Sequence, residues 1–303
     1  MAAKLLYDIM PLLTVFTPTY NRAYSLHLCY DSLCRQTCKD FVWLVIDDGS
    51  TDNTRELVCK WKRENKIPID YYYQENQGMH GAHNAAYRLI ETELNTCIDS
   101  DDYMPDDAVE KIVNFWEQHR STEVAGFMGL DVDFEGNVIG TPFPEGMERT
   151  TIGGFYCHGG KGDKKLVFRT DVVKNYPEYP IFEGEKYGPM GVKIQLIDQD
   201  YELLTLNEPL SCVCYMPDGS TQNMFKQYIF NPKGFSYSRK QSMVLAPTAK
   251  RRFIEAVHYV SSSIMLRNRH FLQESPRPWL VFCAIPFGIL WYIYIRFKTR
   301  KIQ

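Results

Sequence analysis

The sequence lacks an excess of charge of either sign. Its 34 Lys and Arg face 37 Asp and Glu, for a net charge of −3 over 303 residues. A dedicated nucleic-acid binder usually has a strongly basic domain, so this balance argues against nucleic acid as a partner. The other proportions, 45% hydrophobic and 23% charged, are ordinary for a globular protein and exclude wholesale disorder. The length allows one large or two ordinary domains.

Close cysteine pairs are also lacking. Nine cysteines are present, at positions 29, 34, 38, 59, 97, 157, 212, 214 and 283, but no Cys-x-x-Cys pair occurs. A structural zinc site usually needs such pairs, so free core thiols are the better interpretation. No secretory signal is predicted, because the apolar stretch after Met1 is short and contains Asp8. We therefore expect a reduced, cytosolic environment.

The charge is distributed unevenly along the chain. From Arg239 to Gln303, twelve Lys and Arg face two acids, a net of +10, so the part of the chain before Arg239 carries −13. This asymmetry predicts a basic extension that faces a polyanion or a membrane.

A long uncharged run lies inside this basic extension. Residues 279–295 (WLVFCAIPFGILWYIYI) form seventeen uncharged positions, at the lower limit for a membrane-spanning helix. Basic residues flank the run on both sides. A single span would place one basic cluster on the outer side of the membrane, against the positive-inside tendency. We expect a monotopic or re-entrant anchor on anionic lipid at the cytoplasmic face of the cell membrane. A buried core helix is the alternative.

The chain up to about residue 120 alternates β-rich runs with helical patterns. Strands are predicted at 12–17, 41–46, 69–73 and 96–98, and helices at 24–36, 52–66, 81–92 and 106–119. This alternation predicts a parallel sheet covered by helices. Beyond it we expect a hairpin over 124–140, a Gly-rich loop over 158–165, a strand at 201–206, a turn at 217–220, and helices after 232 and over 248–270.

Polar loops follow the predicted strands. They read TPTYNRA, DDGSTDNT, QENQGMHGAHN and DSDDYMP. Ligands of such sheets bind outside the carboxyl ends of the strands, so these loops predict one binding rim.

The densest acidic cluster is Asp99, Asp101 and Asp102. Carboxylates this close repel one another unless a cation relieves them, and Mg²⁺ or Mn²⁺ is typically held by one or two carboxylates with substrate phosphates. A helix cap ahead of Pro105 is the alternative, but three acids exceed what a cap needs. Asp47 and Asp48 form a second cluster, suited to ribose hydroxyls or a base N–H. The Walker phosphate loop is absent.

Four of these motifs, in this order and spacing, resemble family-2 glycosyltransferases of the GT-A fold. They are 17-TPTYNR-22, 47-DDGSTD-52, Asn76-Gln77-Gly78 with Asn84, and 99-DSDD-102. The likeness covers roughly residues 12–120, and more loosely extends to 220. It implies an α/β, Rossmann-like mixed sheet flanked by helices, in a catalytic domain over 1–220 with a nucleotide-sugar half (1–120) and an acceptor half (121–220). A basic helical extension over 221–303 would follow.

The resemblance implies an inverting transferase that uses a nucleotide-diphosphate sugar and Mg²⁺ or Mn²⁺. Thr17, Pro18 and Tyr20 would flank the nucleotide, and Asp48 would contact its base. Asp99 and Asp101 would hold the ribose and the metal-bound diphosphate. The remaining nucleotide-binding candidates are Arg22, Asp47, Gln77, Asn84 and Ser100.

The catalytic base in such enzymes comes from an acidic motif in the second half of the chain. Here the candidates are Glu185, which we prefer, and Glu183, both within FEGEKYGPM, with Asp163 as a third. Relatives often carry Glu after the proline, where this chain has Pro189-Met190. A surface carboxylate is the alternative for either Glu.

The expected reaction is a single sugar addition, because the Gln-x-x-Arg-Trp motif of processive synthases is absent. We expect a hexosyl- or N-acetylhexosaminyl-transferase for envelope or capsule polysaccharide, with a glycan or lipid-linked acceptor at the membrane. The alternatives are a polyprenyl-phosphate glycosyltransferase of the same fold, and a non-catalytic module that binds sugar nucleotides or membranes. An oligomer is left open.

Overall fold

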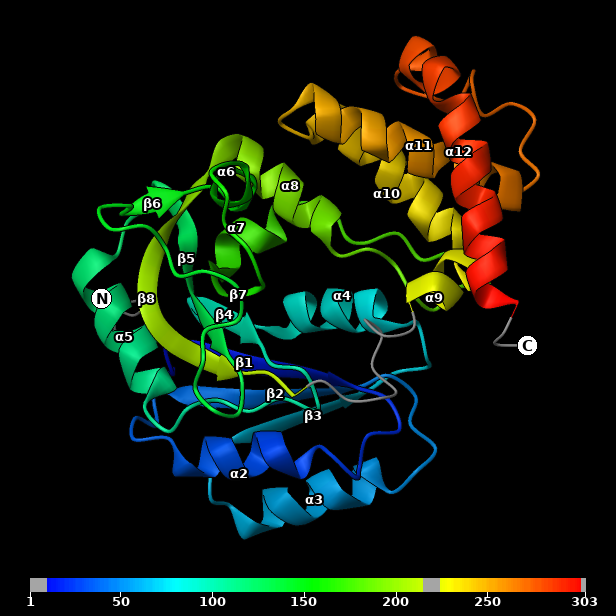
Figure 1. The fold of residues 1–303 in the computed structure, drawn as a ribbon. Helices are drawn as coiled ribbons and strands as arrows, with labels where there is room; N and C mark the ends of the chain where they lie inside the picture. Colours follow the sequence, from blue (N-terminus) through cyan, green and yellow to red (C-terminus); the bar gives the residue numbers. More distant parts are fainter. Residues whose placement is uncertain (1–9, 215–223, 301–303) are drawn as a thin grey trace. The chain divides into compact units, whose positions relative to one another are not determined.

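The computed structural model describes residues 10–214 and 224–300 and divides into two compact units (Figure 1). Among these residues, the sheet unit comprises 10–76, 82–177 and 200–214, and the helical unit comprises 77–81, 178–199 and 224–300. The turn expected at 217–220 and the boundary expected at 220 lie outside the described residues.

The sheet unit is built on eight strands in the order β3-β2-β1-β4-β7-β5-β8-β6. They are β1 (Leu13–Thr19), β2 (Phe41–Asp47), β3 (Ile69–Tyr73), β4 (Leu94–Cys97), β5 (Val124–Val132), β6 (Arg149–Thr150), β7 (Lys164–Arg169) and β8 (Glu202–Cys212). The first four strands pair in parallel, which confirms the predicted arrangement for that part of the chain. The sheet becomes mixed at β7, which runs antiparallel to both β4 and β5.

The prediction of a Gly-rich loop over 158–165 is wrong at its end, because residues 164 and 165 begin β7. This strand carries two lysines at its start, and a lysine pair gives little strand signal. Long-range pairing with β4 and β5, which sequence periodicity does not report, places it in the middle of the sheet.

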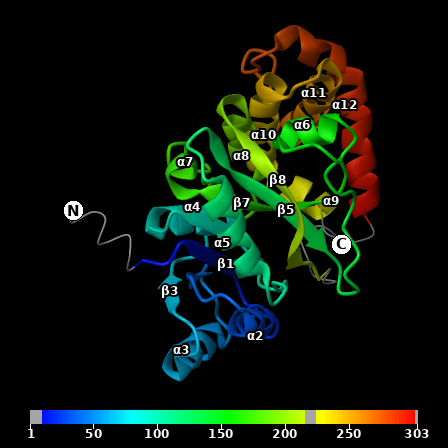
Figure 2. The same cartoon turned by 90° about the vertical axis from the view of Figure 1, so that its left-hand side faces the viewer.

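Helices cover both faces of the sheet (Figure 2). One face packs against α2 (His27–Arg35), α3 (Thr54–Glu64) and α5 (Ala108–His119), which contribute Leu33, Val58 and Trp116 to a core with Trp43 of β2. The other face meets α4 (Met79–Leu89), whose alanines pack on Phe16. Two short helices, α6 (Ile152–Cys157) and α7 (Thr170–Lys174), complete the unit.

The helical unit contains α8 (Gly191–Asp200, except its last residue), α9 (Met224–Phe230), α10 (Pro232–Leu245), α11 (Ala249–Met265) and α12 (Pro278–Thr299). The helices expected after 232 and over 248–270 are confirmed, although α11 ends at Met265. The core of the helical unit joins Met243 of α10, Ala256 and Tyr259 of α11, and Val281 and Ala284 of α12. α12 begins with a proline, which suits a first helical position because its missing N–H would have no partner in the helix.

Candidate functional site

The loops after β1 and β2 are joined into one structure by Asn21. Its backbone has a φ of 53°, a left-handed conformation that asparagine tolerates. Its Oδ1 accepts a hydrogen bond from the Thr51 backbone N–H at 2.7 Å, and its own N–H donates to the Ser50 hydroxyl at 2.9 Å. The Ala23 N–H also donates to the Asp52 carboxylate at 3.0 Å. Sequence reasoning gave Asn21 no role, although its place in a polar strand-end loop was a signal.

The two acids at the end of β2 are buried, at 1% and 3% exposure. The Asp47 carboxylate accepts from the Ser50 N–H at 2.8 Å and from the Tyr71 hydroxyl at 2.6 Å. Asp48 accepts from the Gln74 side-chain amide at 2.7 Å. Asp47 therefore shapes the turn, and Asp48 lies beside it at the carboxyl end of the strand.

The predicted nucleotide-flanking residues of β1 differ in exposure. The Thr17 hydroxyl is buried and accepts from the Trp43 indole N–H at 2.9 Å. Pro18 is also buried, whereas Tyr20 is 48% exposed. Arg22 is half-buried, and its guanidinium lies 4.0 Å from the Asp101 carboxylate. Of the nucleotide-binding candidates in this segment, Tyr20 and Arg22 are therefore the ones that reach the surface.

The acidic loop after β4 exposes some of its carboxylates and buries another. Asp99 is exposed and Asp101 is half-buried, whereas Ser100 and Asp102 are buried. Asp102 accepts from the Cys214 backbone N–H at 2.8 Å. Burial, reinforced by the negative charge of Asp99, raises the pKa of Asp102 to about 7. Asp99 and Asp101 are therefore the carboxylates available to a ligand.

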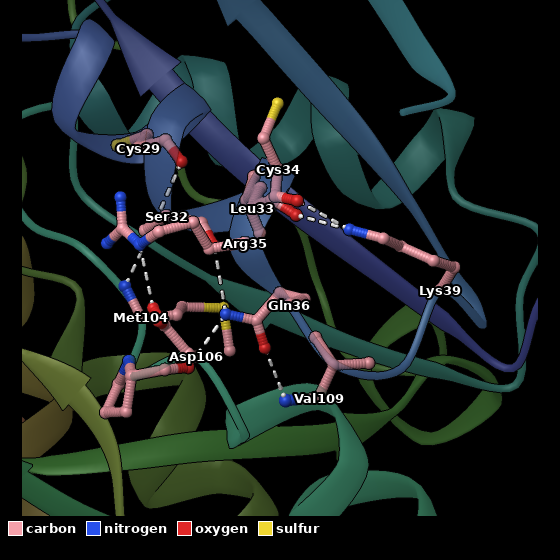
Figure 3. Close-up of polar contacts among 11 residues, drawn as sticks. Cys29, Ser32, Leu33, Cys34, Arg35, Gln36, Lys39, Met104, Asp106 and Val109 are labelled. Carbon is pink, nitrogen blue, oxygen red and sulfur yellow. Dashed lines mark hydrogen bonds and ion pairs between the residues drawn. The ribbon is translucent and has the colours of Figure 1, made fainter. Parts of the chain in front are cut away.

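Helix α2 contacts this loop and the segment that follows it, and Figure 3 shows the contacts with the following segment. The Cys29 thiol donates to the backbone carbonyls of Asp99 and Asp102, each at 3.1 Å. The Gln36 side chain donates to the Pro105 carbonyl at 2.7 Å and accepts from the Val109 N–H at 2.9 Å. The acidic loop is thus fastened at both ends to one helix.

A lysine of β7 lies beneath the acidic loop. The Lys165 ammonium donates to the Cys97 carbonyl at 2.7 Å, just ahead of Asp99 in the chain. Burial opposes its charge, but the carboxylates of Asp131, Asp102 and Asp99 raise the pKa of Lys165. The electrostatic partners of Lys165 are therefore the carboxylates of the acidic loop and of Asp131.

Asp131, at the end of β5, belongs to the same charged cluster. It is 5% exposed, and its Oδ1 finds no hydrogen-bond partner among the described residues. Burial raises the pKa of Asp131 to about 6, although Lys165 opposes the shift. Sequence reasoning missed Asp131, because one acid inside an apolar strand run gives no motif.

Two further nucleotide-binding candidates, Gln77 and Asn84, lie just ahead of α4 and within it. Asn84 is buried on that helix, and Gln77 is half-buried just ahead of it. Within the helical unit, Gly78 has a φ of +82°, and a Cβ there would lie 1.9 Å from the Lys186 carbonyl oxygen. Only glycine therefore lets the 77–81 segment approach the 186 backbone this closely.

The candidate bases lie on different parts of the chain. Glu185 is buried in the helical unit, where its two carboxylate oxygens accept from the backbone N–H groups of Lys233 and Gly234, each at 2.7 Å. It therefore caps the N-terminus of α10. Glu183 is exposed, and its carbonyl accepts from the Lys233 ammonium at 2.9 Å. Asp163 is exposed in the sheet unit.

The donor set of the acidic loop fits a hard divalent cation. Within residues 10–214 and 224–300, no group of three or more His, Cys, Asp or Glu side chains is arranged to hold a metal by itself. A cation held by one or two carboxylates and substrate phosphates needs fewer protein ligands. Asp99 and Asp101 supply accessible oxygens of that kind.

Part of the chain is similar to known sequences. Residues 14–150 match the family described as Glycosyl transferase family 2. The chain is 29% identical over 151 residues to chondroitin synthase of Escherichia coli, a match that covers 49% of this chain and 22% of that protein. The chain thus spans less than two thirds of the length of the first curated relatives it matches.

Solved structures share the fold across most of the chain. S. aureus TarS in complex with UDP-GlcNAc gives a TM-score of 0.59 at 18% identity, covering 91% of this chain and 80% of that one. The mannosyltransferase PcManGT from Pyrobaculum calidifontis, in complex with GDP-Man and Mn²⁺, gives 0.54 at 16% identity, covering 95% and 88%. These likenesses confirm the predicted fold.

Proposed function

We propose that this protein is an inverting glycosyltransferase, because residues 14–150 match glycosyl transferase family 2. It moves one hexosyl or N-acetylhexosaminyl group from a nucleotide-diphosphate sugar to a hydroxyl of a glycan or lipid-linked acceptor. The observation that carries the proposal is the acidic loop at 99–102, which presents an exposed and a half-buried carboxylate, Asp99 and Asp101, at the rim where the loops after β1 and β2 are tied together.

The donor nucleotide is assigned to this rim of the sheet unit. Tyr20 offers an exposed ring, and Arg22 offers a cation for the diphosphate. Asp48 is assigned to the base, although its carboxylate also accepts from Gln74. Asp47, Thr17, Pro18, Asn84 and Ser100 complete the proposed nucleotide-binding set of the sheet unit. Gln77, in the helical unit, is proposed from the sequence motif alone.

Asp99 and Asp101 are the proposed ligands of Mg²⁺ or Mn²⁺. When bound, such a cation neutralises the charge that develops on the leaving nucleotide diphosphate. The chain's own contribution is to hold these carboxylates in position. Cys29 and Gln36 fix the loop backbone, and Lys165 places a counter-charge beneath it.

Glu185 remains our first proposal for the base that removes the acceptor proton, with Glu183 and then Asp163 as alternatives. Two backbone N–H groups fix the orientation of the Glu185 carboxylate, which supports a defined position. The same hydrogen bonds also give the Glu185 carboxylate a structural role, as the cap of α10, that does not depend on catalysis. A test of Glu185 therefore has to separate turnover from folding.

We place the acceptor chemistry in envelope or capsule polysaccharide synthesis, at the cytoplasmic face of the cell membrane. A relative with a polysaccharide product, chondroitin synthase, supports the acceptor class. Helix α12 supports the location, because its 22 residues reach a mean hydropathy of 1.8 and its last turn carries Arg296 and Lys298.

The test is a panel of sugar nucleotides scored for nucleotide-diphosphate release, with Mg²⁺ or Mn²⁺ and with membrane glycans as acceptor. We expect release with one donor, a product of inverted anomeric configuration, and loss of both in Asp101→Asn. Asp70→Asn, an exposed acid of β3, is the matched control and should retain activity. Release that needs a polyprenyl phosphate and survives Glu185→Gln would support the polyprenyl-phosphate alternative. Donor binding without any release would support the non-catalytic alternative.

A further inference from the structure

Helix α12 has two faces of different environment. Val281, Ala284, Gly288 and Ile295 are buried and repeat at helical spacing. At Gly288 the helix approaches α11 so closely that a Cβ would lie 2.4 Å from the Val260 Cβ. This inner face is therefore a packed contact with α11.

The opposite side of α12 is apolar and exposed. We define its outer face as Trp279, Phe282, Phe287, Leu290, Ile293 and Phe297, which are 83%, 57%, 53%, 64%, 55% and 64% exposed. Six large apolar side chains along one helix form a continuous strip of the kind that marks an interaction surface. Phe287 also contacts the Phe253 ring of α11, with the ring centroids 5.6 Å apart, yet it remains 53% exposed.

The charge around the outer face is positive. In a helix, neighbouring residues are separated by about 100°, so Arg296 and Lys298 lie on either side of the strip at Phe297. Of the two acids after residue 238, Glu255 is paired with Arg239 at 2.7 Å and Glu274 with Lys240 at 3.0 Å. Both carboxylates thus form ion pairs with other residues of the helical unit, while Arg296 and Lys298 stay exposed.

We propose that the outer face of α12 binds an anionic lipid bilayer with the helix lying in the plane of the surface. The proposal deepens the membrane location given under the proposed function and does not depend on glycosyl transfer. An apolar strip flanked by cations matches the interfacial layer, where rings and aliphatic chains enter the acyl boundary and Lys and Arg meet anionic headgroups.

The packed inner face distinguishes this mode from a span. A helix that crossed the bilayer through this contact would take α11 with it, and α11 begins with Lys250, Arg251 and Arg252. Charged side chains of that number are costly inside hydrocarbon. Lying on the surface keeps the α11 contact and buries only the outer face.

The experiment is flotation of the purified full chain with vesicles of phosphatidylcholine alone or of equimolar phosphatidylcholine and phosphatidylglycerol. We expect binding to the anionic vesicles, and at least about tenfold weaker binding for Leu290→Glu/Ile293→Glu, because two apolar side chains leave the interface. Val244→Glu, at a 45% exposed apolar site on α10, should bind like the wild type. Circular dichroism and melting temperature confirm that each variant is folded.

Three results would overturn the proposal. The first is that anionic vesicles fail to bind the wild type, or bind the double variant equally well. The second is that the outer face instead mediates self-association, seen as a dimer in sedimentation that the double variant abolishes. The third is a span, seen as protease access to the chain from both sides of a sealed vesicle. None of these readouts uses a sugar donor, so failure here leaves the transferase proposal standing.

Discussion

Single buried charges set the electrostatic character of the rim. Lys165 contacts the Cys97 carbonyl and faces Asp99, Asp102 and Asp131, so one cation is set against several carboxylates. The excess negative charge favours a cation at the exposed Asp99 and the half-buried Asp101. It also leaves the buried acids carrying a cost of ionisation.

Asp131→Asn should therefore stabilise the protein at alkaline pH. The folded-state pKa of Asp131, about 6, exceeds its ordinary value of 3.8, so folding favours the protonated form. The cost of ionisation grows as the pH rises from about 4 to about 6 and is then constant. At pH 8 we expect the free energy of unfolding to increase by about 1–3 kcal/mol, with little change at pH 4. Urea unfolding at both values measures this, and a variant less stable than wild type at pH 8 would contradict it.

Individual residues show which parts of the site a sequence can reveal. Asp99 and Asp101 follow a recognisable strand, and a dense acidic run is visible without a structure. Lys165 and Asp131 are distant in sequence, on strands that pair only in the folded sheet. Their proximity comes from the antiparallel register of β5 and β7, which no local pattern in the sequence encodes.

The element scale is dominated by how helices begin and how they pack. α10 starts at Pro232, and the Glu185 carboxylate accepts from the N–H groups of the second and third residues of this helix, Lys233 and Gly234. A negative charge at a helix N-terminus is favourable, both as a hydrogen-bond acceptor and against the helix dipole. The buried acid thus has a clear structural role whatever its part in the reaction.

Glu185→Gln should lower the free energy of unfolding by about 1–2 kcal/mol, because the amide keeps one acceptor oxygen and loses the charge. Glu183→Gln, at an exposed neighbour, is the matched control and should change stability little. If Glu185 is also the base, kcat falls by orders of magnitude at a temperature where both variants are fully folded. Unchanged kcat in folded Glu185→Gln would exclude it as the base.

Gly288→Val tests the contact between α11 and α12. The added side chain would overlap Val260 and approach the Val257 carbonyl, for which the Cβ alone would lie at 2.9 Å. Overpacking of this kind costs about 1–3 kcal/mol, which thermal unfolding would detect. At Gly191 a Cβ would meet no atom of the described residues within 4 Å, so Gly191→Ala is the control. Equal melting temperatures for Gly288→Val and wild type would show that the two helices are not packed as described.

At the scale of elements, periodicity predicted most of the first half of the sheet unit and the two long helices before α12. Residues 12–17, 41–46 and 69–73 are strands because their apolar runs are short, β-rich and bounded by polar turns. β7 was missed because its position depends on two partners distant in sequence. The short β6 likewise depends on a partner distant in sequence, because it pairs antiparallel with β8.

The whole molecule separates its chemistry by charge. The acidic part of the chain, before Arg239, gathers carboxylates at the rim of the sheet, and the part from Arg239 to Gln303 carries the positive excess. The near-neutral total therefore conceals two surfaces of opposite sign, one suited to a metal–nucleotide complex and one to anionic lipid. The sequence predicted this division, whereas the outer face of α12 could be defined only once the packing on α11 was known.

The most direct test of the central claim is calorimetric titration of the purified protein with UDP and GDP, with Mn²⁺ and with a chelator. We predict that one nucleotide diphosphate binds in the presence of Mn²⁺, binds much more weakly with chelator, and loses affinity in Asp101→Asn but not in Asp70→Asn. The absence of binding by any nucleotide diphosphate, or equal metal-independent binding by Asp101→Asn, would contradict a donor site at the 99–102 loop.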